Sequence, residues 1–227
     1  MKATAILLGI LICAAHASAA EVEALKTYEE KVSYGLGVDM ARNLKRMGVA
    51  VDPDILVQGF RDEFAGERLR MTERELRTVM STHHDEQERK REEMRKKVAE
   101  ENRLMGAEFL AENRAKEGVV TLASGLQYRI LRPGTGRKPT DEDTVECHFR
   151  GTFVNGVEFE STYRRGQPAL LKVKGLIPGW AEALKLMAAG AKWQLFIPPE
   201  LAYGEGGARH VGPNTTVVLE VELIAVR

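Results

Sequence analysis

Three groups of residues in this sequence have types that could do chemistry, but their spacing argues against each group. Cys147 and His148 could pair as nucleophile and base, yet neighbouring strand residues point to opposite faces of a sheet. His83-His84-Asp85 resembles a set of metal ligands, but successive helix residues diverge by about 100°, which favours an ordinary solvated face. Gly204-Glu205-Gly206-Gly207 is rich in glycine, but no helix follows to hold a phosphate group. These patterns predict no metal, no cofactor and no covalent nucleophile.

The stretch from Leu176 to Trp180 has a different potential, because it places a large flat apolar side chain at the start of a helix. Pro178 fits the first helical turn, since its φ is already set for the helix. Trp180, Leu184 and Met187 recur at spacings of four and three, so they share one face of a short helix. Gly190 is a natural left-handed residue to end that helix. Trp180 is then either an ordinary core residue or the floor of an apolar site.

Charge and the N-terminal sequence limit the class of protein. The 227 residues carry 33 basic and 33 acidic side chains, so nothing favours binding to nucleic acid. Residues 1–19 are predicted to be a secretory signal peptide: Lys2 precedes an apolar run that ends before Ala17-Ser18-Ala19, a small-x-small cleavage pattern. The run is too short for a membrane span. A mature chain with Cys147 as its single cysteine suits a bacterial periplasm, with outer-membrane association or secretion as alternatives.

Residues 21–70 are predicted to form two short amphipathic helices. Thr27-x-x-Glu30 is a capping box before a helix that Gly48 ends, and Asp52-Pro53 begins a second helix that ends near Gly66. The apolar residues at helical spacing are Val32, Leu36, Met40, Leu44, Met47, Ile55, Leu56, Phe60 and Phe64. Fewer than about 50 residues cannot bury such faces alone, so we expect the region to need a partner.

Residues 72–116 are predicted to form one long helix, which begins at the capping box Thr72-x-x-Glu75. Its start is amphipathic, and so is its end, where Met94, Val98, Met105 and Phe109 recur. The middle is almost entirely charged, with acid-before-base pairs at i,i+4: Asp85/Arg89, Glu86/Lys90, Glu92/Lys96 and Glu93/Lys97. Each pair contributes roughly 0.2–0.5 kcal/mol, enough together to hold a solvated helix. The balanced charge argues against a membrane-binding helix, so we interpret the segment as a rigid spacer on the order of 65 Å long.

Residues 118–227 are predicted to form an antiparallel sheet with one short helix across it. Seven of the eight prolines lie at or after Pro133. The Asn155-Gly156 pair is a strong hairpin signal. The segments in which apolar and polar residues alternate are 126–130, 145–149, 157–159, 193–197 and 217–223. The predicted fold class is therefore α+β, with a helical N-terminal region, a long connecting helix and this sheet.

In order and spacing, the motifs of the C-terminal part resemble the FKBP-type peptidyl-prolyl isomerases. They are Phe149, Asn155-Gly156, Phe159-Glu160-Ser161, Leu176 to Trp180, Pro198 to Gly204, and the strand 217–223. Ser33 to Gly37 and Gln58-Gly59-Phe60 are similar to the dimerisation region of the subgroup that contains macrophage infectivity potentiator. Tyr163-Arg164-Arg165-Gly166 resembles the periplasmic, chaperone-like members.

The resemblance implies an exported isomerase that assists the folding of proline-containing polypeptides. It implies a homodimer through the N-terminal helices, no cofactor, no nucleic acid and no membrane span, with macrolides as the inhibitor class. It also implies that Trp180 forms the floor of the site and Glu160 lies beside the twisting amide, while the Ile177 amide and the Tyr203 hydroxyl bind substrate carbonyls. The implied walls are Phe149, Phe159, Leu176, Val211 and Leu219.

Several positions depart from the family pattern. Glu160 stands where aspartate is usual, and Phe149 stands where tyrosine is frequent. Leu219 and Ala169 replace aromatic residues, which widens the implied pocket. In relatives with tyrosine and aspartate, the phenol can donate to the carboxylate; here we expect Arg165 to be the donor for a buried Glu160.

Strict alternation would put Phe159 and Glu160 on opposite faces, so both reach the site only if the strand ends or bulges there. Two other functions stay open at this point. One is a holdase chaperone that binds proline-containing segments with little isomerisation. The other is a surface adhesion or virulence factor, for which the sequence offers nothing beyond export.

Overall fold

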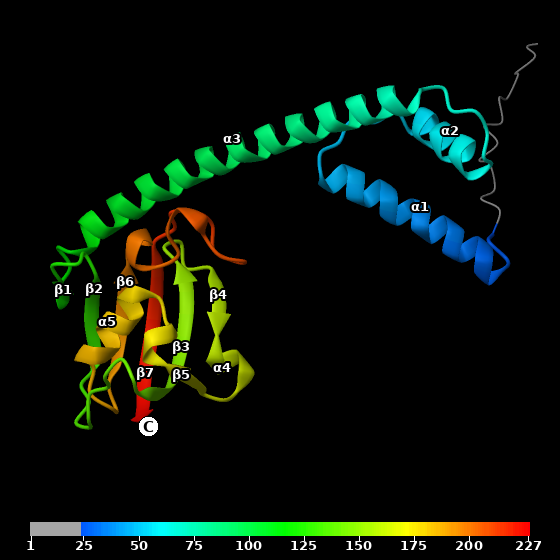
Figure 1. The fold of residues 1–227 in the computed structure, drawn as a ribbon. Coiled ribbons are helices and arrows are strands. Elements are labelled where there is room, and N and C mark those ends of the chain that lie inside the picture. The colour runs from blue at the N-terminus through cyan, green and yellow to red at the C-terminus, as the bar shows by residue number, and fades with distance from the viewer. Residues whose placement is uncertain (1–23) are drawn as a thin grey trace, which may run out of the picture. The chain divides into compact units, whose positions relative to one another are not determined.

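The computed structural model describes residues 24–227, so the predicted signal peptide lies outside the described residues (Figure 1). Contacts divide the chain into two compact units, one that ends at Arg74 and one from Glu75 to Arg227. Within the described part, no helix combines the length and the apolar character that a membrane crossing requires.

The first unit contains the two predicted helices, α1 (Tyr28–Arg46) and α2 (Pro53–Phe64). The capping box is confirmed: Glu30 N–H donates to Thr27 Oγ1 and Thr27 N–H donates to a Glu30 carboxylate oxygen, both at 3.1 Å. Asp52 caps α2 through its side chain. Gly48 and Gly66 follow the two helix ends with φ of +67° and +66°, a conformation that glycine adopts without a Cβ penalty.

The apolar faces of these helices are exposed within the unit. No residue of α1 is buried. The large apolar side chains of these helices and their ends that are at least one-third exposed include Tyr28, Val32, Tyr34, Leu36, Met40, Met47, Ile55, Leu56, Val57, Phe60 and Phe64. Apolar surface of this extent is unusual for a chain that stays monomeric.

The long helix α3 runs from Glu73 to Asn113, three residues shorter at its end than predicted. Its ion pairs are partly in a different register: Glu92 pairs with Lys96 as expected, but Arg89 pairs with Glu93 and Lys97 with Glu101. All of these side chains are exposed, so each pair contributes little by itself.

The second unit is an antiparallel sheet with α5 (Pro178–Leu186) across one face, which confirms the α+β class (Figure 1). Strand β5 (Ala169–Lys172) pairs with β3, and the short helix α4 (Thr162–Arg165) lies between β4 and β5 in the chain. The other strands, in sheet order, are β1 (Val119–Thr121), β2 (Gln127–Arg132), β6 (Lys192–Ile197), β7 (Val217–Val226), β3 (Thr144–Phe153) and β4 (Glu158–Ser161).

The core lies between α5 and alternate residues of β3, β6 and β7, as the period of two predicts. The strand residues are Val145, Cys147, Phe149, Trp193, Leu195, Ile197, Val217, Leu219, Val221 and Leu223, all buried. From α5 and its end, Trp180, Leu184 and Met187 are buried against them.

Two predicted details of this unit are wrong. The helix α5 ends at Leu186 with Met187 as its cap, so Gly190 does not cap it. Gly190 lies instead in the turn before β6, where it donates its N–H to Leu223 O at 2.7 Å. Ile130 lies in the alternating segment 126–130 and was expected to face inward, yet it is 49% exposed, although it pairs in register with the buried Trp193.

Candidate active site

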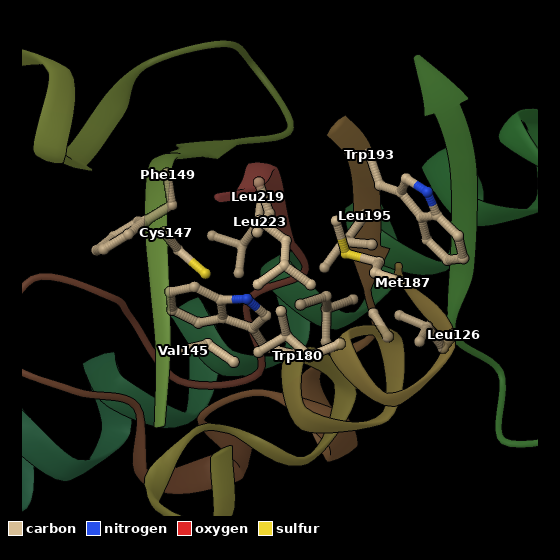
Figure 2. Close-up of a cluster of buried hydrophobic side chains, with 14 of the residues drawn as sticks. Leu126, Val145, Cys147, Phe149, Trp180, Met187, Trp193, Leu195, Leu219 and Leu223 are labelled. Atoms are coloured by element: carbon tan, nitrogen blue, oxygen red, sulfur yellow. The ribbon is translucent and has the colours of Figure 1, made fainter. Parts of the chain in front are cut away.

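Trp180 and Phe149 form the aromatic base of the candidate site (Figure 2). Their ring centroids are 4.8 Å apart and the rings meet at 62°, an edge-to-face arrangement. The helix start at Pro178 brings Trp180 to β3, and alternation in β3 turns Phe149 inward. The indole Nε1 of Trp180 is buried and has no hydrogen-bond partner within residues 24–227.

A β-bulge brings Phe159 and Glu160 to the same face of the sheet. Gly151 pairs with Glu160 while the next residue, Thr152, pairs with Glu158, so Phe159 is the extra residue of β4. The ring of Phe159 lies over Gly151, where a Cβ atom would be 2.6 Å from its Cζ. The condition stated from the sequence is therefore met, and a glycine in the strand makes room for the ring.

Glu160 lies at the rim of the site rather than in its interior. Its side chain is 47% exposed, so the expectation of a buried carboxylate is wrong. The expected partner is confirmed: Arg165 Nη1 lies 3.4 Å from Glu160 Oε1. Both residues line an open depression of about 260 Å³, together with Phe159, Ser161 and Arg164.

Two polar groups in the candidate site have no partner within the described part of the chain. The Ile177 N–H donates to no acceptor there, whereas the Ile177 carbonyl accepts from Trp180 and Ala181 N–H at 3.0 and 3.1 Å. The Tyr203 hydroxyl likewise makes no hydrogen bond among residues 24–227. Partial burial raises the pKa of Tyr203 above its usual value, and the negative charge of Glu160 raises it further. The phenol is therefore a neutral donor near a carboxylate.

The nine predicted site residues are all in the C-terminal domain, at its hydrophobic core or its rim. Glu160 is at the rim, and the other eight belong to or pack against one apolar cluster. The buried members are Phe149, Trp180, Val211 and Leu219. The partly buried members are Phe159, Leu176, Ile177 and Tyr203.

The side chains that the sequence analysis set aside are placed away from one another, as expected. Burial, and then the charge of Glu146, raise the pKa of the Cys147 thiol to about 12, so it cannot supply a thiolate near neutral pH. His148 lies on the other face of β3, stacked on Tyr163 at 4.7 Å. His84 lies 3.4 Å from Glu88 on the exposed surface of α3.

The sequence analysis missed Thr162, which fixes the wall of the site from behind. Its hydroxyl accepts from Phe149 N–H at 2.8 Å and donates to Phe149 O at 3.1 Å, and its side chain is fully buried. The bonds tie α4 to β3 immediately after the bulge. A threonine just after a strand gives no local signal of such a bond, because the partner lies 13 residues earlier in the chain.

Comparisons with known proteins identify the family of this chain. Residues 29–130 match the domain amino terminal to FKBP-type peptidyl-prolyl isomerase, and residues 135–224 match FKBP-type peptidyl-prolyl cis-trans isomerase itself. The outer membrane protein MIP of Legionella longbeachae is 41% identical over 99% of this chain and 96% of its own. The peptidyl-prolyl cis-trans isomerase Mip of Coxiella burnetii is 38% identical over 89% of each chain.

The crystal structure of FkpA from Escherichia coli superimposes with a TM-score of 0.70 at 34% identity, covering 90% of this chain and 99% of that one. A peptidyl-prolyl cis-trans isomerase structure from Pseudomonas syringae matches 56% of this chain with a TM-score of 0.53 at 40% identity. Since both family models and full-length relatives match, the chain belongs to the FKBP-type peptidyl-prolyl cis-trans isomerases and is an enzyme of that type.

Proposed function

We propose that this enzyme isomerises X-Pro bonds in the cluster around Trp180, by withdrawing the amide from water. Rotation about an X-Pro bond has a barrier of about 18–20 kcal/mol and takes tens to hundreds of seconds unaided. Planarity depends on a charge-separated resonance form that water stabilises. An apolar site stabilises that form less, so the twisted amide gains relative to the planar one. The observation that carries the proposal is the apolar cluster of Phe149, Trp180, Val211 and Leu219.

The polar groups at the edge of the cluster hold the substrate backbone in this proposal. The unpartnered Ile177 N–H donates to one substrate carbonyl, and the neutral Tyr203 hydroxyl donates to another. Glu160, fixed by Arg165, lies beside the twisting amide. Phe159 and Leu176 complete the walls. None of these roles requires a covalent bond to the substrate.

We further propose that the protein works as a homodimer in the cell envelope. The exposed apolar faces of α1 and α2 support dimerisation, because two copies can cover them mutually. The signal-like residues 1–19 support export to the periplasm, and one relative carries the name outer membrane protein. Its substrates are then unfolded or refolding envelope polypeptides that contain proline, and macrolides are the inhibitor class to test.

An isomerisation assay beside an aggregation assay tests this function against the holdase alternative. The purified full chain should accelerate cis–trans exchange in a short proline peptide, and a variant with Trp180→Leu should do so at least tenfold less. A holdase would instead suppress the aggregation of an unfolded protein while leaving the peptide rate unchanged. Suppression without acceleration would therefore reject the proposal.

A further inference from the structure

We propose that α3 is a positioning element of the active site, and that its residues Arg95 and Asn102 hold the loop 204–216 in the substrate-binding position. The proposal rests on the proposed function, since it gives a reason for the placement of two site residues. Tyr203 directly precedes this loop, and Val211 lies within it. Figure 1 shows the loop, in orange, next to the C-terminal half of α3, and both belong to the unit from Glu75 to Arg227.

Asn102 fixes the second half of the loop. Its Nδ2 donates to Pro213 O at 2.9 Å and to Thr215 Oγ1 at 3.2 Å. The Thr215 hydroxyl in turn donates to Gly212 O at 2.9 Å, so the amide supports the turn that follows Val211. Val211 is buried in the apolar cluster. It directly precedes Gly212 in the chain, so the turn that Asn102 supports begins next to this site residue.

Arg95, two helical turns earlier, fixes the first half of the loop. Its Nη2 donates to Glu205 O at 3.1 Å and lies 3.5 Å from Gly206 O. These carbonyls follow Tyr203 by two and three residues. The loop also closes on itself, because Asn214 N–H donates to Gly204 O at 2.9 Å. The two side chains therefore hold both ends of one closed turn.

The helix is a firm base for these contacts because the same face is packed further along. No Cβ atom would fit at Gly106, since it would collide with Thr216 Oγ1. The Phe109 and Phe196 rings lie 5.9 Å apart. Asn113 Nδ2 donates to Gln127 Oε1 at 3.0 Å, and Gln127 donates back to Leu110 O at 2.9 Å. The positions 95, 102, 106, 109 and 113 recur at helical spacing, so they form one docking face.

A released loop should weaken substrate binding without changing the chemical step. In the double variant, the loop would keep Tyr203 and Val211 in the binding position for only a fraction of the time. The apparent dissociation constant of the substrate would then rise by the inverse of that fraction. A held fraction of about one-third to one-tenth then raises KM about 3- to 10-fold. Once substrate is bound, the loop is in place, so kcat is retained. A higher KM with an unchanged kcat shows that the lost interaction stabilised the bound substrate and the transition state equally.

The test is the full chain with Arg95→Met and Asn102→Ala combined, assayed on a short proline peptide. Methionine and alanine are at least as good helix formers as the residues they replace, so α3 itself is not weakened. Arg91→Met is the matched control: Arg91 is exposed, one turn earlier, and makes no hydrogen bond or ion pair within residues 24–227. We expect KM to rise about 3- to 10-fold with kcat within about twofold, while the control stays at wild-type values.

Amide hydrogen exchange on the same proteins separates loop release from general loosening. Exchange in residues 204–216 should be faster in the double variant by about tenfold, with β6 unchanged. An unchanged KM in a folded double variant overturns the proposal, and so does a fall in kcat at constant KM with faster exchange throughout the sheet. If the wild-type chain shows no isomerisation, the proposed function fails instead; the exchange result then still reports whether α3 holds the loop.

Discussion

Two tryptophans with nearly equal burial provide a direct test of the floor of the site. Trp180 and Trp193 are 7% and 6% exposed, and both belong to the same cluster. Trp193 stacks on Tyr128 at 4.4 Å, and in Figure 2 it lies on the opposite side of the cluster from Phe149. Trp180 meets the Phe149 ring edge-to-face, and its main-chain N–H donates to Ile177 O at 3.0 Å. Burial alone therefore cannot distinguish their roles, but a rate measurement can.

We predict that Trp180→Leu lowers the isomerisation rate at least about tenfold, which is about 1.4 kcal/mol of transition-state stabilisation. The structural cost should stay below the roughly 3–5 kcal/mol of a truncation to alanine. Leucine also removes the unpartnered Nε1–H, which offsets part of the cavity penalty. The measurements are kcat/KM on a proline peptide and thermal unfolding, with Trp193→Leu as control. Equal rate losses in the two variants would make Trp180 an ordinary core residue.

The second prediction at the scale of residues concerns Glu160 and Phe149, the two positions where this chain departs from the aspartate and tyrosine of its relatives. The bond from Arg165 to Glu160 is already long at 3.4 Å, so Glu160→Asp should break it and lower the rate. Because both side chains are about half exposed, the loss should be at most about fivefold. Phe149→Tyr adds a phenol that can donate to the shorter carboxylate. The double variant should therefore recover most of the rate.

A double-mutant cycle on kcat/KM measures this compensation. Glu158→Asp is the control, because it makes the same change on β4 at a side chain that pairs with Arg150 and Arg164 instead. Independent, additive effects of Phe149→Tyr and Glu160→Asp would refute compensation. They would leave two unrelated substitutions in a tolerant site.

At the scale of elements, the sequence correctly predicted the features that depend on near neighbours in the chain, namely helix caps and the inward-facing residues of strands. The capping box at Thr27, the cap at Asp52 and the inward residues of β3, β6 and β7 are as expected, because each depends on a few neighbours in sequence. The docking face of α3 was predicted only in part. Of the four apolar residues that recur at the end of this helix, Val98 and Phe109 are partly buried, whereas Met94 and Met105 are 60% and 52% exposed.

The reason is that, apart from Phe109, the docking face of α3 consists of polar residues and a glycine. Asn102, Gly106 and Asn113 have low helix propensity. Their contribution comes from contacts with the folded sheet and the loop, which the helix sequence by itself does not reveal. The unusual residues in an otherwise charged helix were the available signal. The bulge at Phe159 shows the same limit, since register is a property of two strands.

We predict that Gly106→Ala destabilises the protein by about 1–3 kcal/mol through collision with Thr216. In an exposed helix the same change would stabilise by roughly 0.5–1 kcal/mol, so the sign itself is informative. Thr216→Ala removes the hydroxyl that the new methyl group would meet. In that background the nearest atom is the Cβ of residue 216 at 3.1 Å, so Gly106→Ala should be clearly less destabilising than in the wild-type chain. Thermal or urea unfolding of the four proteins gives the coupling, and additive changes would show that α3 is not tightly packed against the end of the loop 204–216.

At the scale of the whole chain, the boundary between the two compact units lies at Arg74, so a catalytic fragment should begin at Glu75 rather than at the predicted start of the sheet, residue 118. A cut near Gly118, at the predicted start of the sheet, would remove Asn113 and Phe109 from their partners Gln127 and Phe196. It would also remove the residues that hold the loop 204–216. A chain that begins at Glu75 keeps all of these contacts and lacks α1 and α2 with their exposed apolar faces.

We predict that a chain of residues 75–227 is a folded monomer with nearly wild-type kcat/KM on short proline peptides. It should lose much of its ability to speed the refolding of whole proteins, because two tethered sites raise the effective concentration on one client. Sedimentation gives the oligomeric state. The acceleration of refolding is measured on a protein whose folding is limited by prolyl isomerisation. A matched chain of residues 118–227 should show a KM for the peptide raised at least about 3-fold, since it lacks the residues of α3 that hold the loop 204–216. If residues 75–227 still sediment as a dimer, α1 and α2 are not the dimer interface.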